Sequence, residues 1–292
     1  MHDPNEYPTR SHLRLHRAKQ RARRRNLIVA TSFLAVVVIA GITGYLAYKK
    51  IQSDRKSAVK NYTITLPEGL TNKQVEEKVA EVTEGNISVR EFKAALGAND
   101  YNYRFLSGAV GNLEGFLFPK TYDVTSQTTA HRLINTLLKQ FNIETENLEW
   151  SRARALGVTP YQVVIIASMI EREAKLPEDR PLIASVIYNR LQKGMKLGIC
   201  ATVEYALGSN KPVLSDKDVE IDSPYNTYRI KGLPPGPICN PGFESMRAAL
   251  YPASTDYIYY ILTGSNGKHS FTADYQQFAR WKAELIQKEK QQ

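Results

Sequence analysis

The feature that most constrains this chain is an uninterrupted apolar run close to its N-terminus. The run covers residues 27–48, reads LIVATSFLAVVVIAGITGYLAY and contains no charged side chain. A helix of that length spans roughly 33 Å, which is enough to cross the hydrocarbon core of a bilayer. The polar residues Thr31, Ser32 and Thr43 can bond back to the helix backbone and do not oppose this interpretation. The sequence therefore predicts one transmembrane helix over 27–48.

A cleaved signal peptide is the alternative interpretation of the same run. The apolar stretch is longer than the hydrophobic region of a typical signal peptide, and the basic region before it is also long. The residues that follow, Tyr48-Lys49-Lys50, form a poor cleavage site because signal peptidases prefer small side chains. The sequence thus favours an anchor that is retained.

The distribution of charge predicts the orientation of this anchor. The formal net charge is +10, and residues 1–25 hold eight Lys and Arg against Asp3 and Glu6, a net of +6. Lys49 and Lys50 add +2, so residues 51–292 carry only the remaining +2. Basic residues before the apolar run place the N-terminus in the cytoplasm and the rest outside the cytoplasmic membrane. The nearly neutral exported part argues against nucleic acid as a partner.

The exported part shows a small strand–helix–helix module followed by a larger domain. Residues 1–26 form a basic tail and 49–60 a polar spacer, and the module covers 61–100. Its strand is expected over 62–66, because apolar and polar residues alternate there. Two helices are then expected, each after a capping box: Thr71 with Gln74, and Ser88 with Glu91.

The larger domain, residues 101–292, is expected to contain four helices, two of them apolar core helices, and a hairpin. A helix is expected over 127–143, and Thr159-Pro160-Tyr161-Gln162 marks the start of a core helix whose residues 163–170 read VVIIASMI. Another is expected over 181–193, before Gly194. Strands are expected over 257–262 and 269–271, joined by a turn at 264–267, and a last helix after Asp274. Helices and strands that are not regularly alternating indicate an α+β fold.

The segment in which the core helix meets charged residues, Glu171-Arg172-Glu173, is the strongest candidate for chemistry. A carboxyl group removed from water holds its proton more tightly, so a Glu at the edge of an apolar helix is a candidate general acid. The alternative is an ordinary helix end whose charges are solvated. The five histidines are scattered, three of them before the apolar run, so neither a metal site nor a cofactor is expected.

Several blocks of the sequence together resemble one family. They are ASMIEREA (167–174), IASVIYNRLQKGMKL (183–197), TVEYALG (202–208), YNTY (225–228), GLPPGPICNPG (232–242) and LEGFLFPKTY (113–122). Taken together, and in their order along the chain, these blocks closely resemble the MltG/YceG family of endolytic murein transglycosylases. The resemblance covers roughly residues 60–280, and it implies that 61–100 is a LysM-like module and 101–292 a mixed α/β catalytic domain.

The resemblance implies cleavage of the β-1,4 bond between MurNAc and GlcNAc without water. Glu171 would protonate the glycosidic oxygen and then, as a carboxylate, take the proton of the MurNAc C6 hydroxyl, which leaves a 1,6-anhydro end. A second carboxylate is not needed for this reaction, unlike in most glycosidases. Glu173 is the second candidate, and it would point about 200° away on the helix.

Substrate contacts are expected from side chains that can bond sugar hydroxyls or stack on sugar rings. These are Glu114, Thr202, Tyr205, Tyr225, Asn226 and Tyr228. The segment 232–242, rich in Pro and Gly, is expected to form a rigid loop at the cleft wall.

The two cysteines allow two interpretations, a disulfide or two buried thiols, and the spacing does not decide between them. Cys200-Ala201 stands where the commoner family form has Asp-Pro, and Cys239 occupies another variable position. On that basis we hypothesise that Cys200 and Cys239 are bridged and hold the cleft loops together.

Two other functions compete with the transglycosylase. One is a hydrolytic muramidase in which Glu114 or Glu204 activates water. The other is a non-catalytic scaffold that binds glycan within the cell-wall synthesis complex. The expected partners are peptidoglycan strands, the membrane and, by family resemblance, peptidoglycan synthases.

Overall fold

The computed structural model describes residues 10–56, 59–109, 111–211, 214–264 and 267–289. The chain divides into two compact units, residues 1–59 and 60–292. Over residues 10–56 the first unit is one helix, and the second holds a single hydrophobic core.

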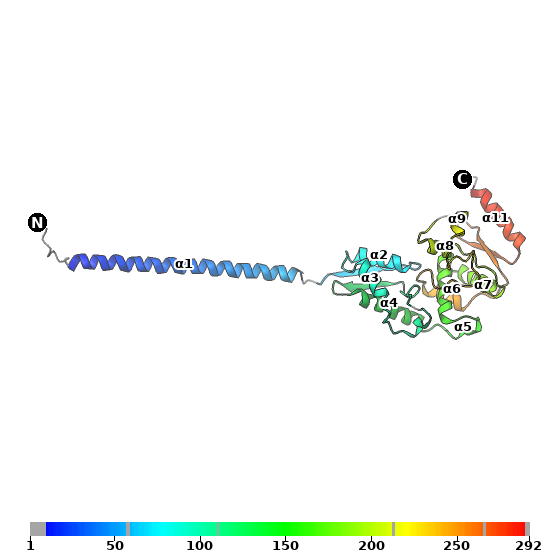
Figure 1. The fold of residues 1–292 in the computed structure, drawn as a ribbon, viewed down its shortest axis with the longest axis horizontal. Helices are drawn as coiled ribbons and strands as arrows, with labels where there is room; N and C mark the ends of the chain where they lie inside the picture. The colour runs from blue at the N-terminus through cyan, green and yellow to red at the C-terminus, as the bar shows by residue number, and fades with distance from the viewer. Residues whose placement is uncertain (1–9, 57–58, 110, 212–213, 265–266, 290–292) are drawn as a thin grey trace. The chain divides into compact units, whose positions relative to one another are not determined.

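Helix α1 (Arg10–Lys56) runs without a break through the predicted apolar span (Figure 1). Its apolar side chains are exposed in the structure, with Leu27 at 67% and Ile39 at 60%. The hydroxyls of Thr31 and Thr43 donate to the carbonyl oxygens four residues earlier, at 3.0 and 2.9 Å. The stretch Lys19–Gln52 is long and apolar enough to cross a membrane. The predicted helix over 27–48 is therefore present, and its surface suits lipid rather than water.

The second unit begins with a small sheet and helices that flank it. These elements are β1 (Asn61–Thr65), α2 (Asn72–Val82), α3 (Val89–Leu96), the 3₁₀ helix η1 (Arg104–Gly108), β2 (Thr121–Thr125) and α4 (Ala130–Thr145). Both predicted capping boxes are formed, at Thr71 and at Ser88. Strand β1 pairs antiparallel with β2, so that Ile64 faces Tyr122 across the sheet. The sheet thus joins the predicted 61–100 module to residues beyond it, and the LysM-like assignment stays a prediction.

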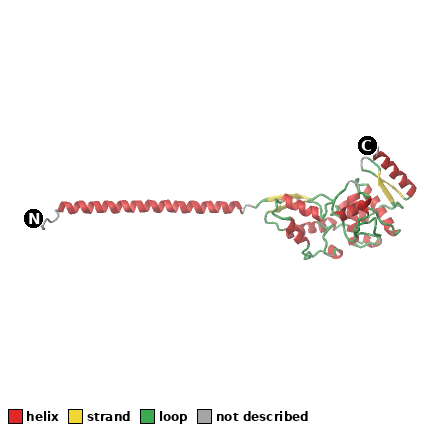
Figure 2. Ribbon diagram, turned by 45° about the horizontal axis from the view of Figure 1, so that its top comes forward, coloured by secondary structure: helices red, strands yellow, loops and turns green. Residues whose placement is uncertain are grey.

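The remainder of the second unit is mainly helical, as Figure 2 shows. Its elements are α5 (Arg152–Ala155), α6 (Pro160–Glu173), α7 (Asp179–Gln192), α8 (Cys200–Leu207), α9 (Asp216–Val219), α10 (Phe243–Leu250), β3 (Tyr259–Leu262), β4 (His269–Thr272) and α11 (Tyr275–Glu289). Helix α6 packs most extensively against α10 and also contacts α7, α8 and η1. Residues 163–170 are all buried. The predicted core helix is confirmed, and it lies where the neighbouring helices converge.

The C-terminal hairpin is also as predicted, with small differences in its ends. Strand β3 starts at Tyr259, two residues later than expected, and pairs with β4 so that Leu262 faces His269. Residues 265–266 of the expected turn lie outside the described part of the chain. Asp274 accepts a hydrogen bond from Gln276 N at 2.8 Å and so caps α11.

Helices α8 and α10 were not predicted from the sequence. Neither has a side-chain hydrogen bond at its N-cap, which is Ile199 for α8 and Gly242 for α10. Sequence signals for a helix start depend on capping side chains, and these two helices have none.

Candidate functional site

The last turn of α6 carries Glu171 into a closely defined environment. Its side chain is only 7% exposed, and its Oε2 accepts a hydrogen bond from Gly242 N at 2.9 Å. Arg180 Nη2, from the first turn of α7, lies 3.9 Å from the other carboxyl oxygen, Oε1. Arg180 is itself anchored, since its Nε donates to Ser245 Oγ at 3.2 Å. A backbone N–H and a guanidinium thus face the two oxygens, and both stabilise a carboxylate.

The loop of residues 232–242 lies directly on α6. Ser168 Oγ accepts a hydrogen bond from Ile238 N at 3.0 Å, and the thiol of Cys239 donates to Ser168 O at 3.3 Å. The Pro- and Gly-rich composition of the loop limits its backbone freedom. These contacts bring the N–H of Gly242, at the end of the loop, to the end of α6.

Asn240 connects this loop to two other segments. Its side-chain oxygen accepts from Gly115 N at 3.1 Å and Leu117 N at 2.9 Å, and its Nδ2 donates to Leu70 O at 2.9 Å. Gly115 has a φ of +92°, and a Cβ there would lie 2.6 Å from Pro237 Cγ. Only glycine permits both the backbone conformation and the close approach. The Asn240 amide is therefore a buried hub that holds three chain segments together.

Glu114 and Tyr205, both predicted to contact substrate, contact each other. Glu114 Oε1 accepts from Asn72 N at 2.9 Å, and its Oε2 accepts from Tyr205 OH at 3.2 Å. The ring of Tyr225 packs on that of Tyr205, with centroids 4.8 Å apart. Burial raises the pKa of Glu114 to about 8, although the two donors lower it. Three of the predicted substrate residues are thus brought together.

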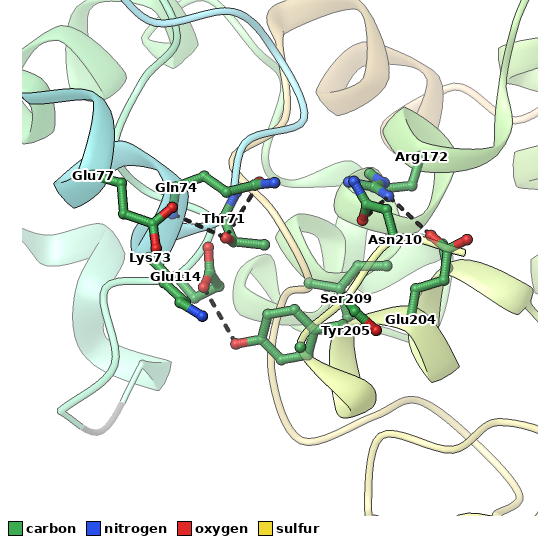
Figure 3. Close-up of a pocket in the computed structure, with 13 residues that line it drawn as sticks. Thr71, Lys73, Gln74, Glu77, Glu114, Arg172, Glu204, Tyr205, Ser209 and Asn210 are labelled. Carbon is green, nitrogen blue, oxygen red and sulfur yellow. Dashed lines mark hydrogen bonds and ion pairs between the residues drawn. The ribbon is translucent and has the colours of Figure 1, made fainter. Parts of the chain in front are cut away.

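A pocket of about 430 Å³ opens beside Glu114 (Figure 3). Figure 3 shows residues near α2 on one side and residues of α6, α8 and the following turn on the other: Thr71, Lys73, Gln74 and Glu77, then Arg172, Glu204, Tyr205, Ser209 and Asn210. Arg172 Nη2 donates to Glu204 Oε2 and to Asn210 Oδ1, each at 2.9 Å. The lining therefore carries both signs of charge. Glu171 is not part of this lining, but its neighbour Arg172 is.

Two other predicted substrate residues form hydrogen bonds within the protein. Thr202 and Asn226 are both fully buried. The Thr202 hydroxyl donates to Ile199 O at 2.7 Å, and Asn226 Nδ2 donates to Val219 O at 2.9 Å and Ile221 O at 2.8 Å. Their polar atoms hold the backbone around α8 and the YNTY block. The sequence pattern did not distinguish these internal bonds from contacts to a ligand.

Glu173 faces a different set of partners from Glu171. Its Oε2 accepts from Tyr260 OH at 3.0 Å, and burial raises its pKa above the ordinary value. Tyr228, the remaining predicted substrate residue, lies on this side, with its hydroxyl 3.0 Å from Cys200 Sγ. The two carboxylates of α6 thus have separate surroundings.

The expected disulfide is not formed in the structure, where both thiols are free. Cys200 is exposed beside Tyr228, whereas Cys239 is buried against the backbone of α6 at Ser168. The bridge is absent because the two thiols have different hydrogen-bond partners, Tyr228 for Cys200 and Ser168 for Cys239. Burial raises the pKa of Cys239 well above its ordinary range.

Metal-ligating side chains do not gather anywhere in the described residues: no group of three or more His, Cys, Asp or Glu is placed to hold an ion. The two histidines of this unit each pair with one aspartate. His131 Nε2 lies 3.0 Å from Asp100, and His269 Nδ1 lies 2.8 Å from the buried Asp179.

Three residues of the site were not singled out from the sequence: Arg180, Asn240 and Gly242. Asn240 and Gly242 lie within the GLPPGPICNPG block, which was assigned only a structural role. The single amide side chain in a block of Pro and Gly is a signal that would have drawn attention to Asn240. For Arg180 the sequence provides no such local signal.

Comparison with known proteins finds a matching family and several relatives. The model of the YceG-like family matches residues 38–284. The endolytic murein transglycosylase of Bacillus subtilis is 40% identical over 217 residues, which are 74% of this chain and 59% of that protein. The protein of the same name from Streptococcus pneumoniae R6 is 32% identical over 229 residues, 70% of this chain and 41% of that protein. The chain therefore spans less than two thirds of the length of these curated relatives.

A crystal structure of a yceG-like protein from Listeria monocytogenes has the same fold. It superposes with a TM-score of 0.67 at 32% sequence identity, covering 75% of this chain and 74% of that one.

Proposed function

The chain belongs to the YceG-like family, and from that premise we propose that it is a membrane-anchored endolytic peptidoglycan transglycosylase. It would cleave the MurNAc-β-1,4-GlcNAc bond of nascent glycan strands and leave 1,6-anhydroMurNAc ends. The curated relatives named endolytic murein transglycosylase support the reaction class. Membrane attachment through α1 and the assignment of Glu171 are parts of the same proposal.

The surroundings of Glu171 carry this proposal. In its protonated form the side chain donates to the glycosidic oxygen, so that the sugar leaving group departs as a neutral alcohol. The carboxylate that remains is stabilised by Gly242 N–H at 2.9 Å and by the nearby Arg180. The same carboxylate then accepts the proton of the C6 hydroxyl as its oxygen attacks C1. One residue thus completes both proton transfers and returns to its starting form.

The contacts of the other carboxylates favour this reaction over hydrolysis. A muramidase needs a base that activates water, and Glu114 and Glu204 were the candidates. Glu114 is occupied by Asn72 N–H and Tyr205 OH, and Glu204 by Arg172. Burial raises the pKa of Glu114 to about 8, so near neutral pH its carboxyl group is mostly protonated and cannot take a proton from water.

The pocket beside Glu114 is proposed to hold the part of the substrate next to the scissile bond. Its Lys73, Glu77 and Arg172 offer both signs of charge, and Tyr205 offers an aromatic face. Sugar rings stack on aromatic faces, and stem peptides carry carboxylates and amines. A mixed lining of this kind suits such a substrate better than a uniformly charged ligand.

The topology that we propose places the N-terminus in the cytoplasm and residues 60–292 on the side of the cell wall. The basic residues before α1's apolar stretch support this orientation. A partnership with peptidoglycan synthases, which act at the same membrane face, belongs to the proposal through family resemblance.

Product analysis tests the function directly. The full chain in detergent micelles is incubated with uncrosslinked nascent glycan, and the new ends are identified by mass spectrometry. We expect 1,6-anhydroMurNAc from the wild type and no new ends from Glu171→Gln. Reducing MurNAc ends would instead identify a muramidase. Glycan of unchanged length with the wild type, together with retained glycan binding, would identify a scaffold.

A further inference from the structure

A second carboxyl group, that of Glu68, lies next to Glu171. Glu68 follows strand β1 in the turn Pro67-Glu68-Gly69. Its carboxyl group packs against the Cα of Gly242, so closely that a Cβ at position 242 would overlap it. Gly242 is the residue whose N–H binds Glu171. The two carboxyl groups therefore meet at the same backbone glycine.

The turn that carries Glu68 is firmly held in this position. Gly69 N donates to Asn240 O at 2.9 Å, and Asn240 N donates to Leu70 O at 2.8 Å. A Cβ at Gly69 would lie 3.8 Å from Glu171 Cγ, in ordinary contact with the stem of that side chain. Two backbone hydrogen bonds thus fix the turn to the loop that also supplies the Gly242 N–H.

We propose that Glu68 is a positioning residue that acts with Glu171 as a carboxyl pair sharing one proton. This inference rests on the proposed function. Two adjacent carboxylates repel each other, so the pair favours the state in which one of them is protonated. Before cleavage the pair holds one proton, and Glu171 donates it to the glycosidic oxygen. The C6 hydroxyl then gives its proton to Glu171, so the pair again holds one proton.

The charges around the pair fit this role. Loss of water raises the pKa of Glu68, the charge of Glu171 raises it further, and Arg180 lowers it. The other charged or titratable groups that face the pair are Arg172 on α6, Glu244 on α10 and Cys239 in the loop. Arg180 Nη2 lies 3.9 Å from Glu171 Oε1, where its positive charge can stabilise the carboxylate that exists after proton donation. The positive charge of Arg180 and the negative charge of a second carboxylate thus act on the pair in opposite directions.

The experiment combines pH profiles with a direct titration. Cleavage by the full chain in micelles is measured as kcat and KM across pH for the wild type, Glu68→Gln and Glu68→Asp. Glu81→Gln is the matched control, because Glu81 is 72% exposed and pairs only with Lys78 among the described contacts. We expect the alkaline limit of kcat to move to lower pH by on the order of one unit in Glu68→Gln. We expect Asp at this position to restore part of that shift, and KM to change little.

Two results would overturn the proposal. A uniform fall in kcat at every pH would indicate a structural role, and a rise in KM without a shifted profile would indicate a substrate contact. Carboxyl NMR of chain labelled with ¹³C-glutamate provides a readout that does not depend on activity. Replacing Glu171 by Gln should lower the titration midpoint of Glu68, and an unchanged midpoint would refute the pairing. Should the wild type fail to cleave glycan, the proposed function falls while this titration still decides the pairing.

Discussion

Helices α1 and α6 are both rich in apolar residues, but their apolar side chains have opposite surroundings in the structure. Along α1 the apolar side chains remain exposed, as with Val37 at 51%, whereas Val163 and Ile166 of α6 are completely buried. The charges next to the apolar stretch of α1 include Lys49 and Lys50, which lie in solvent. The charges at the end of α6 are instead bound by neighbouring segments. An apolar sequence thus predicts that a helix avoids water. The segments that flank it determine whether its apolar side chains pack in a protein core or stay exposed on the helix surface.

The largest expected effect tests the polar end of α6. Glu171→Gln should lower cleavage by about 10²–10⁴-fold, since it removes a general acid and base. Its melting temperature should stay near that of the wild type, because an amide can still accept the Gly242 N–H. Glu173→Gln, two residues along the same helix, should retain most of the activity. The opposite pattern would assign the chemistry to Glu173.

The apolar parts of the two helices can be compared by the same kind of truncation. Ile166→Ala should destabilise the 60–292 unit by about 2–5 kcal/mol, because it leaves a cavity in the core. Val37→Ala in α1 should leave the stability of that unit unchanged, since Val37 belongs to the other unit and its side chain is exposed. Denaturant unfolding of the full chain in micelles, followed by tryptophan fluorescence, measures both. Equal effects would contradict the assignment of separate environments.

The buried carboxyl group of Glu114 should make the stability of the second unit depend on pH. Its pKa is about 8 in the folded protein and near 4.5 in the unfolded chain. The folded state therefore binds the proton more tightly, and stability should fall as pH rises from about 4.5 to about 8, by up to ~1.4 kcal/mol per pH unit. Glu114→Gln should remove this slope. A slope that is unchanged in the variant would assign the effect to other groups.

The smallest expected effect comes from comparing Thr159 and Thr43, whose hydroxyls each bond to the backbone of their own helix. Thr159 caps α6 by accepting from Gln162 N, so Thr159→Ala should cost about 1 kcal/mol. Thr43 in α1 donates to carbonyl groups that already take part in the helix, so Thr43→Ala should have almost no effect. Unfolding midpoints of the second unit measure the first change, and the helix signal in circular dichroism measures the second. A comparable loss in both would show that the cap contributes nothing specific.

The parts of the fold that were predicted correctly are those with local signals. The capping boxes at Thr71, Ser88 and Thr159 mark helix starts within four residues of sequence, and each is formed. The strand at β2 and the helices α5, α8, α9 and α10 were missed. Helices α5 and α9 have only four residues each, too few for a periodic pattern, although Ser215 forms a capping box at α9. Helices α8 and α10 have no capping side chain, and β2 is defined by its pairing with β1, some 60 residues earlier.

The candidate site follows the same division. Glu171 was predicted to be the reactive carboxyl group from its place at the end of an apolar helix and from family resemblance, and this role remains a proposal. Thr202 and Asn226, drawn from the same resemblance, are buried and donate hydrogen bonds to backbone carbonyl groups. A sequence block indicates that a segment matters to a fold, but it does not indicate whether a side chain in it faces a ligand or the backbone.

The sequence by itself determined the apolar span of α1, the helix whose last turn carries Glu171 and the near-neutral charge of residues 51–292, because these depend on composition and on contacts a few residues apart. Only the tertiary structure decided what surrounds Glu171. Gly242 follows Glu171 by 71 residues in the chain, whereas Glu68 precedes Glu171 and lies in the turn after β1. Their approach depends on Asn240, which binds the backbone at Leu70 and Gly115 across distances of 170 and 125 residues. Such contacts form only when the core packs, and no local pattern of residues specifies them.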